Sequence, residues 1–120
     1  MIVSYPTNFS KQSSMAASRP TQEIVYHAKK QIEAGDLEGV QQMYLEILNT
    51  EFETGHEPDP AYMFRNLYIH ACLKGQGIIA EWLTRALYHN MDPIQQIALR
   101  QIFPYGRLLL ARAEKKMQRH

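Results

Sequence analysis

The residues best suited to catalysis or metal binding are scattered along this chain. The histidines occupy positions 27, 56, 70, 89 and 120, with no HExxH or CxxC spacing among the candidate ligands. His70 and Cys72 are two residues apart, so they do not share a helix face and make poor joint ligands. His56, Glu57 and Asp59 lie close together in a loop. Such a cluster is more often a solvated turn than a metal site.

Nucleophilic and nucleotide-binding motifs are also weak. Gly75-Gln76-Gly77 lacks a preceding strand and a third glycine, so it indicates a turn between helices and not a dinucleotide fingerprint. Cys72 lies beside an apolar stripe and is expected to be a small buried hydrophobe. No Ser-His-Asp set or carboxylate pair stands out. We therefore expect a protein without enzymatic activity, cofactor or bound metal.

Charge is distributed unevenly. Residues 1–60 hold four bases and nine acids, a net charge of −5, and residues 61–120 hold nine bases and three acids, a net charge of +6. Halves of opposite sign favour an acidic partner for the basic half, or head-to-tail self-association. The alternative is that both signs intersperse on the folded surface.

The basic half supplies candidate contacts to nucleic acid. Trp82 and several tyrosines near Arg65 and Arg85 could stack on bases, although aromatic residues at helical spacing are more often core. The candidate phosphate contacts are Arg65, Arg85, Arg100, Arg107, Arg112, Lys115, Lys116 and Arg119.

Apolar residues recur at helical spacing from residue 21 to residue 118, which predicts an all-α domain. Gly35 is expected to end a first helix, and Asp36 to cap a second. A central hairpin turns at residues 74–77. Asp92-Pro93 begins a fifth helix, and a break at Pro104 and Gly106 precedes a sixth over 105–117. Six helices then form three antiparallel hairpins, stacked as a short α-solenoid or a compact bundle.

The apolar stripes predict which side chains face inward. They comprise Ile78, Ile79, Trp82, Leu83, Ala86 and Leu87 on the fourth helix, Ile94, Ile97, Ala98 and Ile102 on the fifth, and Leu108, Leu109 and Ala113 on the sixth. Leu108, Leu109 and Leu110 are consecutive, so they cannot all point inward. Leu110 or a neighbour is expected to stay exposed, which makes Leu108 and Leu110 candidate interface residues.

Residues 1–20 differ from the rest in containing no acid and no sustained apolar period. They are expected to form a flexible or partner-wrapping arm, whose Ile2, Tyr5 and Phe9 could fill pockets on a neighbour. An acid-poor, serine-rich start also resembles part of an organelle transit peptide, but one Lys and one Arg are few for that role. The absence of a long apolar run predicts no membrane span, and a single cysteine favours a reducing compartment such as the cytoplasm.

The segment EPDPAYMFRNLYIHACLKGQG resembles the pentatricopeptide repeat family, in which a PD dipeptide, a Tyr, an apolar stripe and a CxKxG turn recur in that order. The tetratricopeptide family is the neighbouring alternative. Residues 33–36 and 73–76 form matching turns, and residues 59–93 have the length of one helical-hairpin repeat. The resemblance implies single-stranded RNA recognition through polar residues early in the first helix. Met63, Phe64 and Arg65 stand there instead, which argues against base-coded reading.

Two functions are therefore expected. The first is a small helical interaction module or assembly subunit that binds itself or a larger protein through its arm and terminal helices, as an accessory protein of a virus or large complex would. The second is single-stranded nucleic-acid binding through the basic half. Clustering of the basic groups on one face would favour the second.

Overall fold

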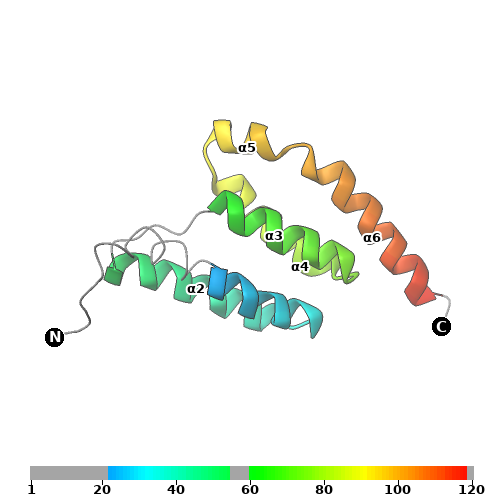
Figure 1. Cartoon of the computed structure of the whole chain (residues 1–120), viewed down its shortest axis with the longest axis horizontal. Coiled ribbons are helices and arrows are strands. Elements are labelled where there is room, and N and C mark those ends of the chain that lie inside the picture. Colours follow the sequence, from blue (N-terminus) through cyan, green and yellow to red (C-terminus); the bar gives the residue numbers. More distant parts are fainter. Residues whose placement is uncertain (1–21, 55–59, 119–120) are drawn as a thin grey trace.

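The computed structural model describes residues 22–54 and 60–118, and every regular element in them is helical (Figure 1). A helix over 22–33 is followed by α2 (Leu37–Thr54), α3 (Pro60–Leu73), α4 (Gly77–Ala86), the short 3₁₀ helix η2 (Tyr88–Asn90), α5 (Pro93–Leu99) and α6 (Ile102–Gln118). The expected all-α fold is confirmed. The expected arm over 1–20, the loop at 55–59 and Arg119 lie outside the described residues.

Two turns with the same geometry connect the first four helices. Gly35 and Gly75 both adopt positive φ, at 70° and 73°, a conformation that glycine reaches without steric cost. In each turn the following residue donates its N–H back to a carbonyl five residues earlier, from Asp36 to Gln31 and from Gln76 to Ala71. The Asp36 carboxylate also caps α2 by accepting from Gly39 N–H at 2.9 Å.

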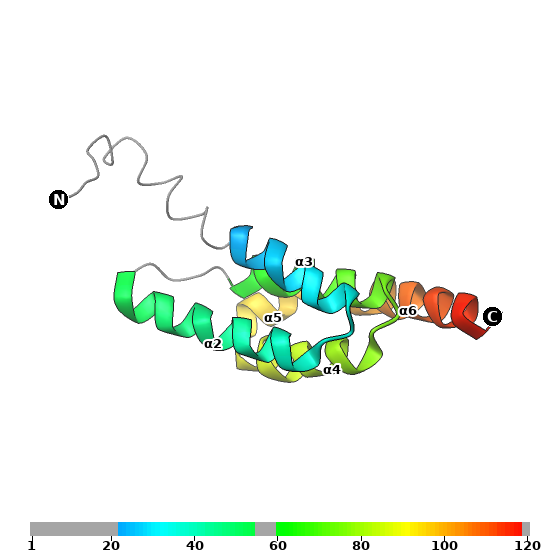
Figure 2. The same cartoon turned by 90° about the horizontal axis from the view of Figure 1, so that it is seen from below.

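The helices are arranged as successive hairpins. The helix of residues 22–33, α3 and α6 run in one direction, while α2 and α4 run back (Figures 1 and 2). The middle helix α3 contacts both α4 and α6. The first hairpin and α6 consequently lie at opposite edges of the stack, as Figure 1 shows most clearly.

An aromatic cluster forms the centre of the core. Phe64 on α3 is completely buried, and its ring lies 5.1 Å from Tyr68, 5.6 Å from Tyr88 and 5.9 Å from Phe103, measured between centroids. These partners come from α3, η2 and α6, so one side chain joins three elements. Aromatic pairs at such separations add to the stabilisation from buried apolar area.

The predicted break at Pro104 and Gly106 is wrong. The chain turns earlier, at residues 100–101, and α6 begins at Ile102. Pro104 therefore lies in the first turn, where the missing N–H would have had no helical partner. Gly106 is buried, and an ideal Cβ there would overlap the ring of Tyr68. The glycine thus permits close packing of α6 on α3.

Several predicted inward faces also need correction. Ile94 is 80% exposed and Ile97 is also exposed, because α5 has only two turns and directs Leu99 and Gln96 toward the body. Gln96 Nε2 donates to the carbonyls of Tyr88 and Met91, which fixes this orientation. Ala98 is exposed as well.

The start of α4 is likewise less buried than predicted. Ile78 is 73% exposed, whereas Ile79 and Leu83 are buried as expected. Trp82 is partly buried and packs edge-on against Tyr44 of α2, with centroids 5.7 Å apart. Trp82 therefore contacts the first hairpin and is less buried than the predicted inward face implies.

The helix α4 ends at Ala86, and the 3₁₀ helix η2 follows it. The Asn90 amide donates to the Ala86 carbonyl at 2.8 Å, which satisfies one of the free carbonyls at the helix end. Within the described residues, no helix is both long enough and apolar enough to span a membrane.

Candidate functional site

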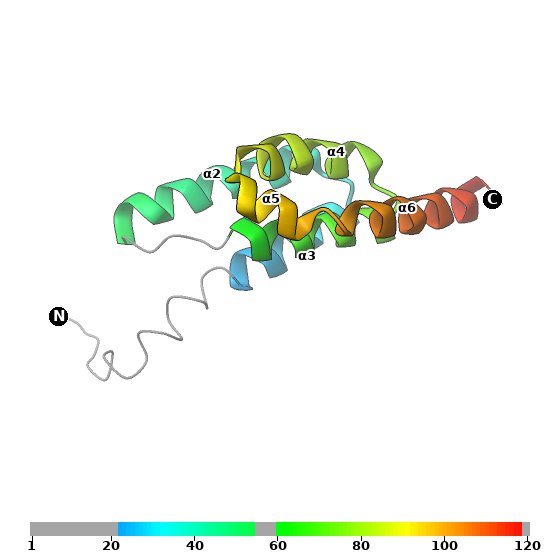
Figure 3. The same cartoon turned by 90° about the horizontal axis from the view of Figure 1, so that it is seen from above.

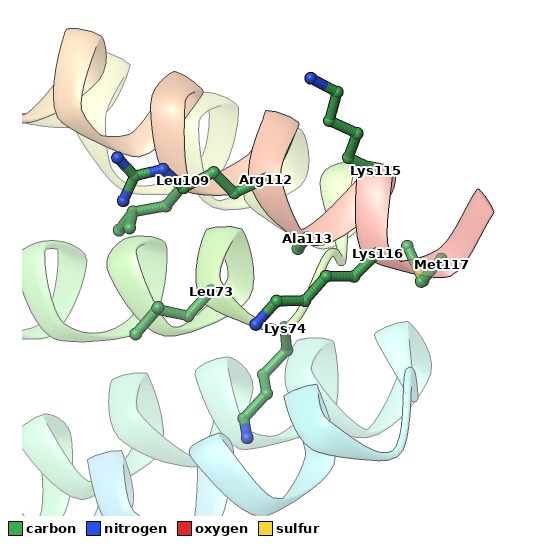
Figure 4. Close-up of a pocket in the computed structure, with 8 residues that line it drawn as sticks. All are labelled: Leu73, Lys74, Leu109, Arg112, Ala113, Lys115, Lys116 and Met117. Atoms are coloured by element: carbon green, nitrogen blue, oxygen red, sulfur yellow. The ribbon is translucent and has the colours of Figure 1, made fainter. Parts of the chain in front are cut away.

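A groove lies between the C-terminal ends of α3 and α6, among several basic residues (Figure 4). Its volume is about 600 Å³, within the range of roughly 300–1,000 Å³ typical of ligand pockets. The lining residues are Leu73, Lys74, Leu109, Arg112, Ala113, Lys115, Lys116 and Met117. We call this feature the α3–α6 groove.

The floor of the α3–α6 groove is apolar. Leu109, Ala113 and Met117 follow one another at four-residue intervals, so they lie on the same face of α6. Leu73 is the last residue of α3 and lines the opposite side of the groove. Leu73 is 52% exposed and Met117 is 53% exposed. The floor therefore offers apolar surface that the chain itself does not cover.

Gly75 sets how closely α6 approaches the turn after α3. An ideal Cβ at this position would lie 2.7 Å from Met117 Cε and 3.4 Å from Ala113 Cβ. Glycine is favoured at position 75 because its φ is positive and because a Cβ there would be too close to Met117. The turn between α3 and α4 is consequently packed against the end of α6.

Four cations and no carboxylate are among the lining residues, but Lys74 extends away from α6 toward the first hairpin (Figure 4). Lys116 reaches from α6 toward the end of α3, Arg112 extends along α6 beside Leu109, and Lys115 points away (Figure 4). The carboxylate of Glu114 lies instead near Gly77, within 3.9 Å of an ideal Cβ there. The groove thus combines an apolar floor with positive charge.

A second, smaller hollow of about 260 Å³ adjoins the first across α3. It is lined by Lys29, Arg65, Asn66, Ile69, His70 and Leu73. Leu73 is common to both hollows. Together their linings contain six Lys or Arg side chains and no Asp or Glu.

His70 connects this surface to the first helix. Its Nε2 donates to Glu33 Oε2 at 2.9 Å. Burial lowers the pKa of His70 and outweighs the opposing effect of Glu33, while the charges of Lys29 and Lys74 lower it further. The hydrogen bond from His70 lowers the pKa of Glu33.

These two shifts predict a loss of stability in acid. The ordinary pKa of His70 is 6.5. As pH falls below that value, the unfolded chain binds a proton more readily than the folded chain, and Glu33 adds to the effect at lower pH. We expect the free energy of unfolding, measured by urea titration, to decrease from about pH 7 to about pH 5.

The variant His70→Gln is the matched control for this prediction. Glutamine keeps an amide donor near Glu33 but does not titrate, so the slope of stability against pH should flatten above about pH 5. If the variant and the wild-type protein show the same slope of unfolding free energy against pH, His70 does not cause the pH dependence.

The other potentially reactive groups in the core are held neutral. Cys72 is buried, and its burial raises the pKa of the thiol. Burial also raises the pKa of Tyr68 to about 12. Over the described part of the chain, no three His, Cys, Asp or Glu residues are grouped closely enough to hold a metal ion. The proposed His56 loop lies outside the described residues.

The structure brings together about half of the predicted phosphate contacts. Arg65, Arg112, Lys115 and Lys116 line the two hollows. Arg85 lies on α4 and pairs with Glu81 at 3.5 Å, while Arg100 and Arg107 are exposed but outside both linings.

The two leucines predicted to contribute to a protein interface differ in exposure. Leu108 was expected to face inward but is half-exposed, whereas Leu110 is partly buried, with its side chain near Gly77. Ile2, Tyr5 and Phe9 lie outside the described residues. Sequence reasoning did not identify Leu73, Met117 or Lys74, although the four-residue spacing of Leu109, Ala113 and Met117 is a readable signal.

Comparisons with protein-family models, with curated proteins and with solved structures found no match. The case for a function therefore rests on the geometry and charge of the α3–α6 groove.

Proposed function

We propose that this protein is a non-enzymatic helical interaction module that binds an acidic, amphipathic segment of a partner protein in the α3–α6 groove. The observation that carries the proposal is the half-exposed apolar floor, bordered by cations with no carboxylate in the lining. An amphipathic helix laid into an apolar groove is a common mode of peptide recognition.

Apolar contact would supply affinity and charge would supply selectivity. Covering the exposed halves of Leu73 and Met117 is worth roughly 1 kcal/mol each, half the value for burying such a side chain completely. Arg112 and Lys116 would attract carboxylates and repel basic segments, which mainly affects association rate and orientation.

Single-stranded nucleic-acid binding is the second candidate, favoured by the clustering of six cations over the two hollows. Base stacking normally needs exposed aromatic rings, and the two linings, as far as the structure describes them, include none. Met63 and Phe64 are buried in the core, so they cannot read bases in the manner that the pentatricopeptide resemblance implies. The protein partner is therefore the stronger proposal.

A direct test uses fluorescence anisotropy with three labelled probes. They are a helical peptide with leucines on one face and glutamates on the other, the same peptide with lysine for glutamate, and an oligouridylate. The acidic peptide should bind at least about tenfold more tightly than the lysine peptide, since like charge is repelled by the rim. Equal binding of the two peptides, or tighter binding of the oligouridylate, would overturn the proposal.

A further inference from the structure

The helix α2 carries charge opposite to that of the groove. Its 18 residues include four glutamates and no Lys, Arg or His. Val40 is buried on one face and Tyr44 is partly buried, with its hydroxyl donating to the Ala86 carbonyl of α4. On the opposite side of its described part, residues 37–46, exposed side chains face solvent.

The exposed face of α2 has the pattern expected of a ligand for the α3–α6 groove. Leu45 is 58% exposed, and the side chains of Glu38, Gln42 and Glu46 are also exposed. Positions 38, 42, 45 and 46 fall on one side of a helix. We call them the α2 stripe. The stripe presents one large apolar side chain between carboxylates, which complements an apolar floor bordered by lysine and arginine.

The α2 stripe cannot fill the groove of its own chain. α2 belongs to the first hairpin and α6 packs on α3, so that α3 and α4 lie between α2 and α6 (Figure 1). The last turns of α2 also extend beyond the neighbouring helices (Figures 2 and 3). A complementary pair of surfaces at opposite edges of one chain can meet only between two copies.

We infer that the occupant of the α3–α6 groove is the α2 stripe of a second copy of this chain. The inference rests on the proposed function and names its partner. The two surfaces differ, so the contact is head-to-tail, and each added copy leaves one free stripe and one free groove. Assembly then continues into an open filament or closes into a ring. Salt slows the association, because attraction between exposed charges is screened.

Two variants separate the two sides of this contact. The groove variant, Arg112→Glu with Lys116→Glu, keeps its α2 stripe. The stripe variant, Leu45→Ser with Glu46→Gln, keeps its groove and carries no charge that the reversed groove could attract. All four positions line the groove or are exposed on α2, so both variants should retain their helix content, which circular dichroism checks.

Size-exclusion chromatography with light scattering gives the readout. We expect wild-type mass to rise with concentration, each variant alone to stay monomeric, and an equimolar mixture of the two to form a complex of two chains that grows no further. This complementation arises only when one intact stripe meets one intact groove.

Two results would overturn the inference. They are a wild-type protein that is monomeric at every concentration, and variants that do not complement each other. The stripe variant retains the groove, so it should still bind the acidic probe peptide. If the stripe variant binds the probe peptide while the wild-type protein stays monomeric, the occupant of the groove is another protein and the proposed function stands. If the stripe variant does not bind the probe peptide, the proposed function fails too.

Discussion

The variant Phe64→Ala should lose about 3–5 kcal/mol of stability, the range for truncating a buried aromatic side chain. Phe64 is completely buried and contacts rings from α3, η2 and α6, so its loss leaves a cavity where three elements meet. Urea denaturation followed by circular dichroism measures the change. The expected loss is a large fraction of the stability of a small domain.

Tyr105→Ala is the matched control for this core prediction. Tyr105 lies on α6 but is more than half exposed. Its truncation should change the free energy of unfolding by about 0.5 kcal/mol or less, as for most surface substitutions. Equal losses for the two variants would mean that Phe64 is not at the centre of the core.

Charge reversal in the α3–α6 groove should weaken binding of the acidic probe peptide. Replacing Arg112 and Lys116 by glutamate turns attraction into repulsion at two positions, and we expect the affinity to fall by at least about tenfold, or roughly 1.4 kcal/mol. Fluorescence anisotropy at constant ionic strength measures the dissociation constant of the peptide for each variant.

The double variant Arg100→Glu with Arg107→Glu is the control for charge. It changes the net charge by the same amount, but both residues lie outside the groove. Binding should fall much less than in the groove variant. If the two double variants weaken binding equally, the net charge of the chain governs it and the groove has no special role.

The sequence predicts most of the fold because local signals agree. Glycine at positive φ and an aspartate cap mark the turn at Gly35-Asp36, and Asp92-Pro93 begins α5 with a capping box. These capping and turn signals involve residues that are close together in the sequence. Helix starts and hairpin turns can therefore be predicted without knowing the tertiary packing.

The failures occur where packing decides between local alternatives. Pro104 and Gly106 resemble a helix break, but a proline is tolerated in the first turn of α6, and the glycine is required by the ring of Tyr68. Ile94 is exposed because Gln96 anchors α5 through the carbonyls of Tyr88 and Met91. Neither contact can be inferred from apolar spacing.

The groove was harder to predict than the helices. Leu73 and Met117 are 44 positions apart in the sequence and meet only through the packing of α6 on α3. The sequence shows the basic half of the chain, but the rotation of each helix decides which cations share a face. Arg112 and Lys116 join Lys74 at the groove, while Arg85 lies elsewhere on α4.

The most direct test of the proposed groove is a titration of the isotope-labelled protein with the acidic probe peptide, followed by amide chemical shifts. We predict that the largest shifts fall on residues 73–75 and 109–117, with smaller ones near Arg65 and His70 in the adjoining hollow. Shifts centred instead on the exposed isoleucines of α5, or spread evenly over all basic residues, would contradict the account.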